Sequence, residues 1–322
     1  SAAVVAAELG AKVVLIDDNP TVGGQLIKQT HKFFGSKSHY CGVRGIDIAK
    51  ILGEKIKHPN VNLMLNSSVI GYYQDNILGV VQFNRFLKVY AQRIIIATGA
   101  AENLIAFPNN DLPGVYGAGA VQTLMNVHGV LPGKRALMVG SGNIGLIVSY
   151  QMMQAGIEVV AVIEIMDKIG GYHVHAAKLR RLGVPILTSH TIKYAIGNDC
   201  VKGAIIVKVN KQLKPIKGTE KRLKVDMICL AVGLTPLSEL LYQAGCRINY
   251  IPELGGNVEE ASTAMLEGRI AGANAYQSLF GKNDKAQAII ACAKKELSEI
   301  RQGPFGIRPK MGKEKLFTSI PT

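Results

Sequence analysis

The stretch Arg135-Ala-Leu-Met-Val-Gly140-Ser-Gly142-Asn-Ile-Gly145-Leu-Ile-Val-Ser decides the fold of this chain. The apolar run before Gly140 is short enough for one buried strand, and it meets a Gly-x-Gly-x-x-Gly turn. Apolar residues at helical spacing follow as far as Gly156, and a second strand pattern, Ile157 to Ile163, ends in Glu164. A strand, a glycine turn, a helix and a strand that ends in an acid are typical of a dinucleotide-binding βαβ unit.

Each residue type in the turn has a physical reason to be there. Gly140 permits the tight turn, Gly142 lets the backbone approach a pyrophosphate, and Gly145 lets helix and strand pack closely. We expect cofactor contacts from the whole turn, namely Gly140, Ser141, Gly142, Asn143, Ile144 and Gly145. The Glu164 carboxylate would accept hydrogen bonds from ribose hydroxyls and repel a 2′-phosphate, which favours NAD over NADP. The alternative is a βαβ unit whose glycines serve packing alone.

Composition sets the class of protein. With 322 residues, 48% of them hydrophobic, the chain can bury a large core and is expected to form two domains. The formal net charge is +14, but the basic residues are not interleaved with aromatics and match no nucleic-acid module, so we expect no nucleic-acid partner. We interpret the excess as solvated surface that can attract an anionic cofactor or an acidic partner protein.

The five cysteines are widely spaced and form no Cys-x-x-Cys pair, which argues against a dithiol redox centre and against a metal site. No uncharged apolar stretch reaches the length of about 20 residues that a membrane span needs, and no secretory signal is visible. We therefore expect a cytoplasmic protein. Because Ser1 stands within a helical pattern and no Met precedes it, we also expect that the sequence is part of a longer chain.

The N-terminal half repeats part of the central pattern. Ser1 to Leu9 is apolar at helical spacing, and Lys12 to Ile16 is a strand pattern closed by Asp17 and Asp18. This is the second half of a βαβ unit. The double glycine that follows, Gly23-Gly24-Gln25, would let the backbone pass close to a ligand, although a simple loop turn explains it equally well.

A meander and a closing strand complete that half. Ile46 to Ile56 predicts an amphipathic helix, and an antiparallel meander is expected from the four strand patterns Val61 to Leu65, Val69 to Tyr73, Leu78 to Phe83 and Phe86 to Tyr90. Arg93 to Ile96 runs into Ala97-Thr98-Gly99-Ala100. This pattern predicts a buried strand that ends in small residues, where a flat ligand lies close.

The C-terminal half repeats the order. Phe107 to Gly114 is proline-rich and is interpreted as a domain crossing, and Gly117 to Val127 predicts a helix before the central motif. After Glu164 come meander strands around a lysine-rich loop, Ala204 to Val209 and Leu223 to Val225. A strand pattern that ends in Ala231-Val-Gly233 closes the repeat.

These residues resemble the two-dinucleotide-binding flavoproteins of the pyridine-nucleotide disulfide reductase superfamily. Within it they are most similar to the FAD/NAD-binding subunits of heteromeric dehydrogenases, such as sarcosine oxidase alpha, opine oxidase A, hydrogen cyanide synthase B and dye-linked L-proline dehydrogenase alpha. The similarity covers nearly the whole chain. Its most specific motifs are Gly23-Gly24-Gln25, Ala97-Thr98-Gly99-Ala100-Ala101-Glu102, Leu112-Pro-Gly-Val115 with Ala118 to Leu124, and Ala261-Ser-Thr-Ala-Met-Leu-Glu-Gly-Arg-Ile-Ala-Gly272.

The resemblance implies an α/β protein with two Rossmann-like, three-layer dinucleotide-binding domains, each with a small antiparallel meander. The FAD domain would comprise residues 1–113 and 227–280, the NAD domain 114–226, and a C-terminal helix and basic tail 281–322. On the FAD side Asp17, with Asp18 beside it, corresponds to the acid that binds the adenosine ribose. The remaining FAD candidates by resemblance are Gly23, Gly24 and Gln25 along the flavin, Val69 at the adenine, Ala97, Thr98 and Gly99 at the strand end, and Ala261 and Ser262 at a helix start facing the flavin.

The chain departs from the family pattern twice. The family's first glycine turn would precede Ser1, and a Gly-Asp segment is missing between Asn257 and Glu259. Both pieces contact FAD in the family, so two explanations stand: the pieces were left out of the sequence, or the protein has given up FAD. We favour omission, and an intact mass near 34.5 kDa would contradict it.

Few side chains are candidates for the chemistry itself, because in this superfamily the flavin carries the electrons. We assign no catalytic residue. A lone Cys41 has no thiol partner, His173 and His175 are expected at the surface, and Glu102 is expected to contact the flavin or a partner, to cap a helix, or to form a salt bridge. Lys285 to Ile300 predicts an amphipathic helix, and the basic tail after it would dock on a partner subunit or another copy of the chain.

Three functions fit this pattern. The first is an FAD-dependent, NAD(H)-linked subunit of a heteromeric amine or amino-acid dehydrogenase of the proline, sarcosine or opine type, with a separate catalytic subunit. The second is a nucleotide-binding scaffold subunit that has lost FAD. The third is a stand-alone NADH-dependent reductase of a small electron carrier.

Overall fold

The computed structural model describes residues 1–33, 37–248 and 261–302. The described residues form two compact units: residues 1–26, 32–33, 37–100, 235–248 and 261–302 make the first, and residues 27–31 with 101–234 make the second. The domain boundaries predicted at 113/114 and 226/227 stay a prediction.

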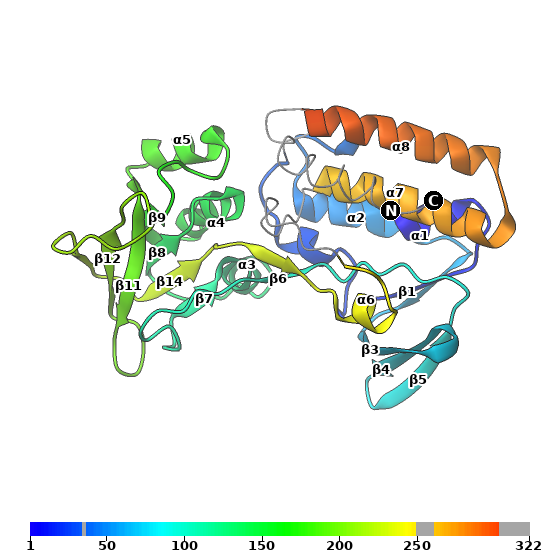
Figure 1. The fold of residues 1–322 in the computed structure, drawn as a ribbon, viewed down its shortest axis with the longest axis horizontal. Coiled ribbons are helices and arrows are strands. Elements are labelled where there is room, and N and C mark those ends of the chain that lie inside the picture. Colours follow the sequence, from blue (N-terminus) through cyan, green and yellow to red (C-terminus); the bar gives the residue numbers. More distant parts are fainter. Residues whose placement is uncertain (34–36, 249–260, 303–322) are drawn as a thin grey trace. The chain divides into compact units, whose positions relative to one another are not determined.

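The second unit is built on a parallel sheet of five strands in the order β10-β9-β8-β14-β7 (Figure 1). The strand of the central motif, β8, therefore lies in the middle of the sheet. A strand buried on both faces must be apolar at every position, which explains the continuous Ala136 to Val139 run. The strands are β7 (Val115–Gly117), β8 (Arg135–Val139), β9 (Glu158–Glu164), β10 (Ile186–Thr188) and β14 (Met227–Leu230).

Two layers cover the sheet. Ala136 and Met138 of β8 pack against helices on one face, and Leu137 and Val139 pack on the other against a small antiparallel sheet. The helices are α3 (Ala118–Asn126), α4 (Asn143–Gln154) and α5 (His173–Arg181), and the antiparallel strands are β11 (His190–Ile196), β12 (Gly203–Lys208) and β13 (Lys221–Leu223). Three layers with a dinucleotide-type βαβ core confirm the predicted α/β class for this half.

The first unit combines helices with two small sheets. Strand β1 pairs in parallel with β2, and β3, β4 and β5 form an antiparallel sheet. The helices are α1 (Ala2–Glu8), α2 (Gly45–Lys55), α6 (Glu239–Gln243), α7 (Ala261–Phe280) and α8 (Asp284–Gln302). The strands are β1 (Val13–Ile16), β2 (Val61–Met64), β3 (Ser67–Tyr73), β4 (Ile77–Gln82) and β5 (Arg85–Tyr90), and short 3₁₀ turns are η1 (Gly24–Lys28), η2 (Lys37–His39) and η3 (Gln74–Asn76).

Two expectations for this unit are wrong. Val61 to Leu65 does not belong to the meander, because β2 pairs with β1 in register Val13 to Val61. Arg93 to Gly99 forms no strand within the described residues, and Ile95 is 40% exposed. A β-branched run marks a segment that suits a sheet, but the strand exists only where a neighbour supplies its hydrogen bonds. Pairing begins one residue later, where β6 (Ala100–Glu102) meets β15 (Leu234–Pro236).

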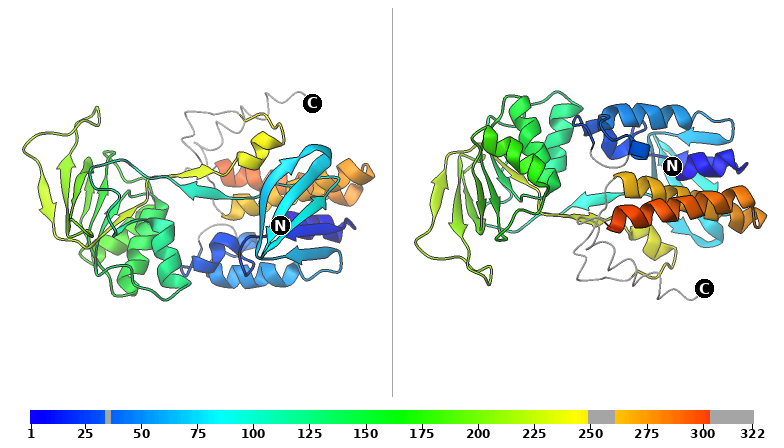
Figure 2. Two further views of the ribbon diagram at one scale, coloured as in Figure 1. Left: turned by 90° about the horizontal axis from the view of Figure 1, so that it is seen from below. Right: turned by 90° about the horizontal axis from the view of Figure 1, so that it is seen from above.

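The predicted amphipathic helix near the C-terminus is present as α8. Its apolar residues Ala286, Ala293 and Leu297 are buried, and they pack with residues of α7 in two small clusters. Figure 2 shows α7 and α8 running side by side. The apolar face of α8 is thus covered within its own unit. The predicted docking role of the basic tail concerns residues 303–322, which lie outside the described residues.

Candidate functional site

The first and third glycines of the central turn are required by packing within the protein. Gly140 follows β8 with φ +103°, and a side chain there would collide with the carbonyl oxygen of Ala231. A side chain at Gly145 would collide with the carbonyl oxygen of Gly140. These two positions hold helix α4 tightly against the end of the sheet.

Gly142 is different, because nothing in the protein requires a glycine there. Its backbone is extended, with φ −65° and ψ 174°, and no heavy atom lies within 4 Å of the position that a Cβ would take. Gly142 also occupies the N-cap position of α4. The helix N-terminus is therefore open on the side of Gly142, where backbone N–H groups and the positive end of the helix dipole attract an anion. These residues fit a dinucleotide pyrophosphate.

Glu164 ends β9 and lies against the glycine turn. One carboxylate oxygen accepts hydrogen bonds from the backbone N–H and the hydroxyl of Ser141, at 2.9 and 2.7 Å, and the other accepts one from the N–H of Met166 at 3.0 Å. Ser141 is fully buried, so this contact is shielded from water. The carboxylate keeps further lone pairs for ribose hydroxyls.

The loop after Glu164 is fastened to the same turn. The N–H of Gly171 donates to the Ser141 carbonyl oxygen at 2.9 Å, and the N–H of Tyr172 donates to Asn143 Oδ1 at 2.8 Å. Ile144 stands at the edge of the turn with 39% of its surface exposed. The structure thus gathers the glycine turn, Glu164 and the Gly170-Gly171 loop at the carboxyl end of β8 and β9, where open α/β sheets bind ligands.

In the first unit Asp17 and Asp18 follow β1. Asn19 donates to Asp17 Oδ1 from its backbone at 2.9 Å and its side chain at 3.0 Å, and the same side chain reaches Asp18 Oδ1 at 2.8 Å. The N–H of Ser67 donates to the Asp17 carbonyl oxygen, which brings the start of β3 beside the acids. Val69, two residues further on, sits at a register shift of β3.

The small-residue candidates of this unit lie in turns. Gly23 and Gly24 have φ of +125° and +49° and lead into η1, with Gln25 exposed to solvent. After exposed Ala97, the Thr98 hydroxyl donates to the Leu237 carbonyl oxygen at 2.9 Å, and Gly99 has φ +76° with open space around it. Ala261 and Ser262 begin α7. The predicted loss of a Gly-Asp segment between Asn257 and Glu259 lies outside the described residues.

The structure contains one buried polar cluster that the sequence patterns did not predict. Residues Ile27–His31 belong to the second unit, where Thr30 accepts a hydrogen bond from Gln151 of α4 at 2.8 Å. The Gln151 amide oxygen accepts one from Gln122 of α3 at 2.7 Å, and both glutamines are 3% exposed. The sequence contains a sign of this cluster, because one glutamine interrupts the apolar face of α3 and another that of α4. Buried amides of this kind are satisfied in pairs.

Two histidines join this cluster. His175, expected at the surface, is instead buried and stacks with Tyr172 at 6.1 Å between ring centroids, so that expectation is wrong. Burial lowers the pKa of His175, with the charge of Lys178 adding to the effect. Burial, helped by the nearby His175 and Lys178, lowers the pKa of His31 to about 4.

The His31 pKa predicts an acid-sensitive unfolding equilibrium. An unfolded chain binds a proton on this histidine below its ordinary pKa near 6.5, whereas the folded chain does not until about pH 4. The free energy of unfolding should therefore fall as pH drops through this window, by on the order of 2 kcal/mol once partial exposure is allowed for. Urea titrations at pH 7 and pH 4.5 measure it. In the variant His31→Gln the free energy of unfolding should fall less between pH 7 and pH 4.5. The control substitution His173→Gln, at an exposed position, should leave this fall unchanged.

Glu102 caps a helix, which was one of its predicted roles. Its carboxylate accepts hydrogen bonds from the N–H groups of Gly119 at 2.6 Å and Ala120 at 3.2 Å, in the first turn of α3. Lys28 lies beside it and donates to the Gly119 carbonyl oxygen at 3.3 Å. Burial lowers the pKa of Lys28, and the Glu102 charge partly opposes this.

Removing this cap should cost stability. Glu102→Ala is expected to lower the free energy of unfolding by about 1–2 kcal/mol, because two helix N–H groups lose a charged acceptor. Glu102→Gln should lose less, since its amide oxygen still accepts. Urea unfolding of the three proteins measures the difference, and an unchanged Glu102→Ala variant would argue against the capping role.

The cysteines form no disulfide among the described residues, and they differ in burial. Cys229 is buried in β14, and burial raises the pKa of its thiol. Cys41, Cys200, Cys246 and Cys292 are exposed and unpaired as disulfides. Across the described ranges no three His, Cys, Asp or Glu side chains gather as metal ligands. Of the helices in those ranges, none has the length and apolarity to cross a bilayer.

Two subunits of known oxidases are similar in sequence to most of this chain. The alpha chain of sarcosine oxidase from Rhizobium meliloti is 25% identical over 260 residues, which cover 76% of this chain and 24% of that protein. The A component of opine oxidase from Agrobacterium tumefaciens is 23% identical over 285 residues, 79% of this chain and 54% of its own length. The chain thus spans about half or less of these relatives.

The fold has solved counterparts. L-proline dehydrogenase from P. horikoshii superposes with a TM-score of 0.65 at 20% identity, covering 92% of this chain and 56% of the other. The family model described as pyridine nucleotide-disulphide oxidoreductase matches residues 1–254. Since that match spans most of the sequence, the chain belongs to the pyridine nucleotide-disulphide oxidoreductase family.

Proposed function

We propose that this chain is the FAD- and NAD(H)-binding subunit of a heteromeric dehydrogenase that oxidises an amine or amino acid of the proline, sarcosine or opine type. The observation that carries the proposal is Gly142, a glycine at an open helix N-terminus where no protein atom would obstruct a side chain. Relatives named as oxidase subunits support the heteromeric part. Those names are also the basis for the substrate class and for the second polypeptide.

The nicotinamide nucleotide is assigned to the second unit. The N–H groups at the start of α4 would hold the pyrophosphate beside Gly142, and Gly140 and Gly145 would keep that helix end in place. Glu164, fixed by Ser141, would orient the adenosine ribose. Its negative charge opposes a 2′-phosphate, so NAD(H) is favoured over NADP(H).

FAD is assigned to the first unit. Asp17, held by Asn19, would bind the adenosine ribose, and Val69 would meet the adenine from β3. Residues 23–25 and 97–99 would border the cofactor with small side chains, while Ala261 and Ser262 would present the positive end of the α7 dipole. Bound flavin supplies the hydride chemistry, and the protein positions it and sets its potential.

A visible spectrum with an anaerobic titration tests the proposal. The purified full chain should show flavin absorbance, which NADH bleaches and NADPH bleaches far less effectively. Absence of flavin from protein expressed in flavin-rich medium would contradict the redox function. Flavin that NADPH reduces as well as NADH would contradict the role of Glu164.

A further inference from the structure

The antiparallel sheet of the first unit has an unusual outer face. In its register Gly79 of β4 lies between Gly71 and Lys88, and Ile77 lies between Tyr73 and Tyr90. The alternate residues Leu78 and Val80 are buried and form the inner face. Sheets with one solvated side normally carry polar residues there. Here the outer row is apolar as well, apart from Lys88.

Large aromatic side chains on or beside this row are exposed. Tyr73 is 50% exposed, Phe86 54% and Tyr90 68%, while Phe83 in the turn between β4 and β5 is 73% exposed. Four aromatic residues within one hairpin-sized segment are more than the scattered apolar exposure of a typical surface. Clustered exposure of this kind marks an interaction surface.

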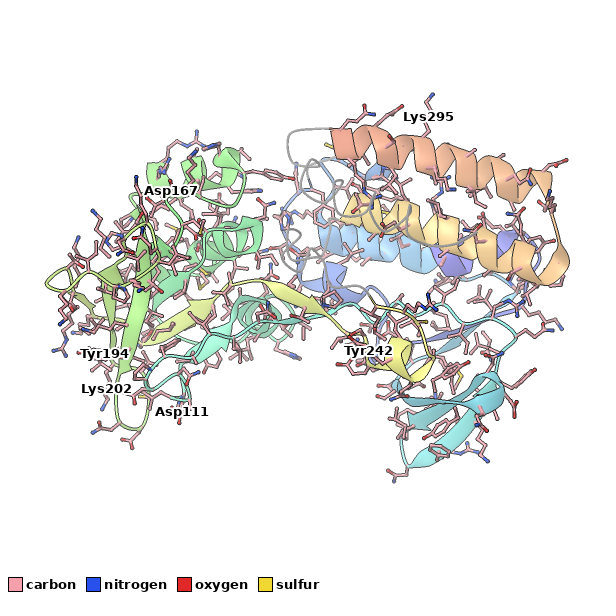
Figure 3. The ribbon with its side chains drawn as sticks, in the orientation of Figure 1. Asp111, Asp167, Tyr194, Lys202, Tyr242 and Lys295 are labelled. Carbon is pink, nitrogen blue, oxygen red and sulfur yellow. The ribbon has the colours of Figure 1, made fainter. Side chains whose placement is uncertain are left out.

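A three-stranded antiparallel sheet in the second unit provides an internal comparison. Strands β11, β12 and β13 have the same three-stranded antiparallel order, yet their exposed residues are mostly cationic, with Tyr194 beside them (Figure 3). These exposed cations are Lys193, Lys208, Lys221 and Arg222. The sheet architecture by itself therefore does not require aromatics outside. The face in the first unit has another reason to be apolar.

A hollow on this face gives the surface an anchor point. It has a volume of about 350 Å³ and is lined by Tyr73, Ile77, Gly79, Phe86 and Lys88. The rings of Tyr73 and Phe86 reach to 2.9 and 3.2 Å from the point where Gly79 would carry a Cβ. The two rings therefore lie over the glycine and form the aromatic base of the hollow. An aromatic base of this kind can receive an anchoring side chain from a partner, which is how interface hot spots are built.

Charge indicates which partner fits. Lys88 lines the hollow, and the strands β3, β4 and β5 contain Lys88 and Arg85 but no aspartate or glutamate. The strands of a second copy would therefore offer no carboxylate to Lys88, and the one acid between β3 and β5, Asp75, lies in the η3 turn outside the strands. A different polypeptide can offer both an apolar anchor and an acid, and aromatic residues are enriched at interfaces of that kind.

We propose that this aromatic face (Tyr73, Ile77, Phe86, Lys88 and Tyr90) docks the second subunit of the enzyme, through an apolar side chain in the hollow and a carboxylate on Lys88. The inference rests on the proposed function only in requiring a second subunit. The edge of β3 is already occupied, since Gln243 of the α6 helix accepts a hydrogen bond from the Tyr72 N–H at 2.7 Å. The partner therefore uses the face of the sheet and not that edge.

Photo-crosslinking tests the placement. The full chain, carrying p-benzoylphenylalanine in place of Phe86, is co-expressed with the polypeptide encoded beside it and irradiated as the purified complex. A product with the summed mass of the two polypeptides is expected. The same probe at Phe280, which is 60% exposed at the end of α7, is the matched control and should give little of it. A product of two copies of this chain, or none from Phe86 in an intact complex, would overturn the proposal.

Binding measurements test the chemistry. Lys88→Glu and Tyr90→Ser should each weaken binding of the second subunit, with a dissociation constant raised at least about tenfold. Flavin absorbance and NADH-dependent dye reduction should be unchanged, whereas Lys282→Glu, an exposed cation elsewhere in the unit, should bind normally. Binding of phosphatidylglycerol vesicles that requires Phe86 would reassign the face to a membrane. A chain that reduces dyes but never binds a second polypeptide overturns the docking and leaves the redox function standing.

Discussion

Replacing Gly142 by valine is expected to raise the dissociation constant for NADH by at least about 100-fold while the protein stays folded. No heavy atom of the protein lies within 4 Å of the position that a Cβ would take at Gly142, so the valine Cβ meets no protein atom. Its backbone conformation, φ −65° and ψ 174°, is one that valine adopts readily. The branched side chain would instead fill the approach to the first turn of α4, where we place the pyrophosphate.

The neighbouring glycines are the matched controls. Valine at Gly145 would collide with the carbonyl oxygen of Gly140, and any side chain at Gly140 would collide with that of Ala231 at φ +103°. These two variants should fail to fold or should unfold at much lower denaturant. Gly142→Val should lose about 1 kcal/mol or less, the usual effect of a poor N-cap residue.

The measurement is a fluorescence titration with NADH alongside urea unfolding of each variant. Unchanged NADH affinity in a folded Gly142→Val protein would remove the main support for a nucleotide at this turn. Loss of folding in that variant would show that the space beside Gly142 is not open. Retained flavin with lost NADH affinity would separate the two proposed cofactor sites, since the residues that we assign to FAD lie in the first unit.

The central βαβ unit was predictable because its signals are local. Strand β8, the glycine turn and α4 are contiguous, and the continuous apolar run of the strand follows from burial on both faces. The contact between Ser141 and Glu164 also follows from the motif, since parallel strands end at one edge of the sheet. Spacing along the chain is enough to place such residues.

Features that depend on distant partners were not predictable. The pattern of Val61 to Met64 suits a strand, but nothing local shows that it pairs with β1 and not with β3. The burial of His175 depends on packing around α5, which its neighbours in sequence do not reveal. Residues 27–31 belong to the second unit because they form hydrogen bonds with Gln122 and Gln151, which are distant in sequence. The periodicity of apolar residues and the local composition do not specify which distant segments a strand or helix contacts.

Helix α7 carries the second large effect, at Gly272. Its Cα faces α1, where an added Cβ would collide with the carbonyl oxygen of Ala2 and lie 3.0 Å from the Ala2 carbonyl carbon. Gly268, one turn earlier on the same face, leaves 3.1 Å to the Ser1 Cβ. Two small residues one turn apart thus let the helices touch, and the buried Val5 and Ala273 pack around the crossing.

At Gly272, helix propensity favours a residue with a side chain, whereas packing against α1 opposes one. In a solvated helix Gly→Ala gains about 1 kcal/mol. At Gly272 the new methyl group must push α1 away, at a cost of about 1–3 kcal/mol, so Gly272→Ala should destabilise the protein in spite of its better propensity. Gly272→Leu should cost about 3 kcal/mol or more, because a branched side chain cannot fit against the backbone of α1. The exposed Asn274 on the same helix is the control, and Asn274→Leu should leave stability within about 0.5 kcal/mol. Urea unfolding followed by circular dichroism measures all three, and a Gly272→Ala protein more stable than the parent would mean that α1 does not rest on α7.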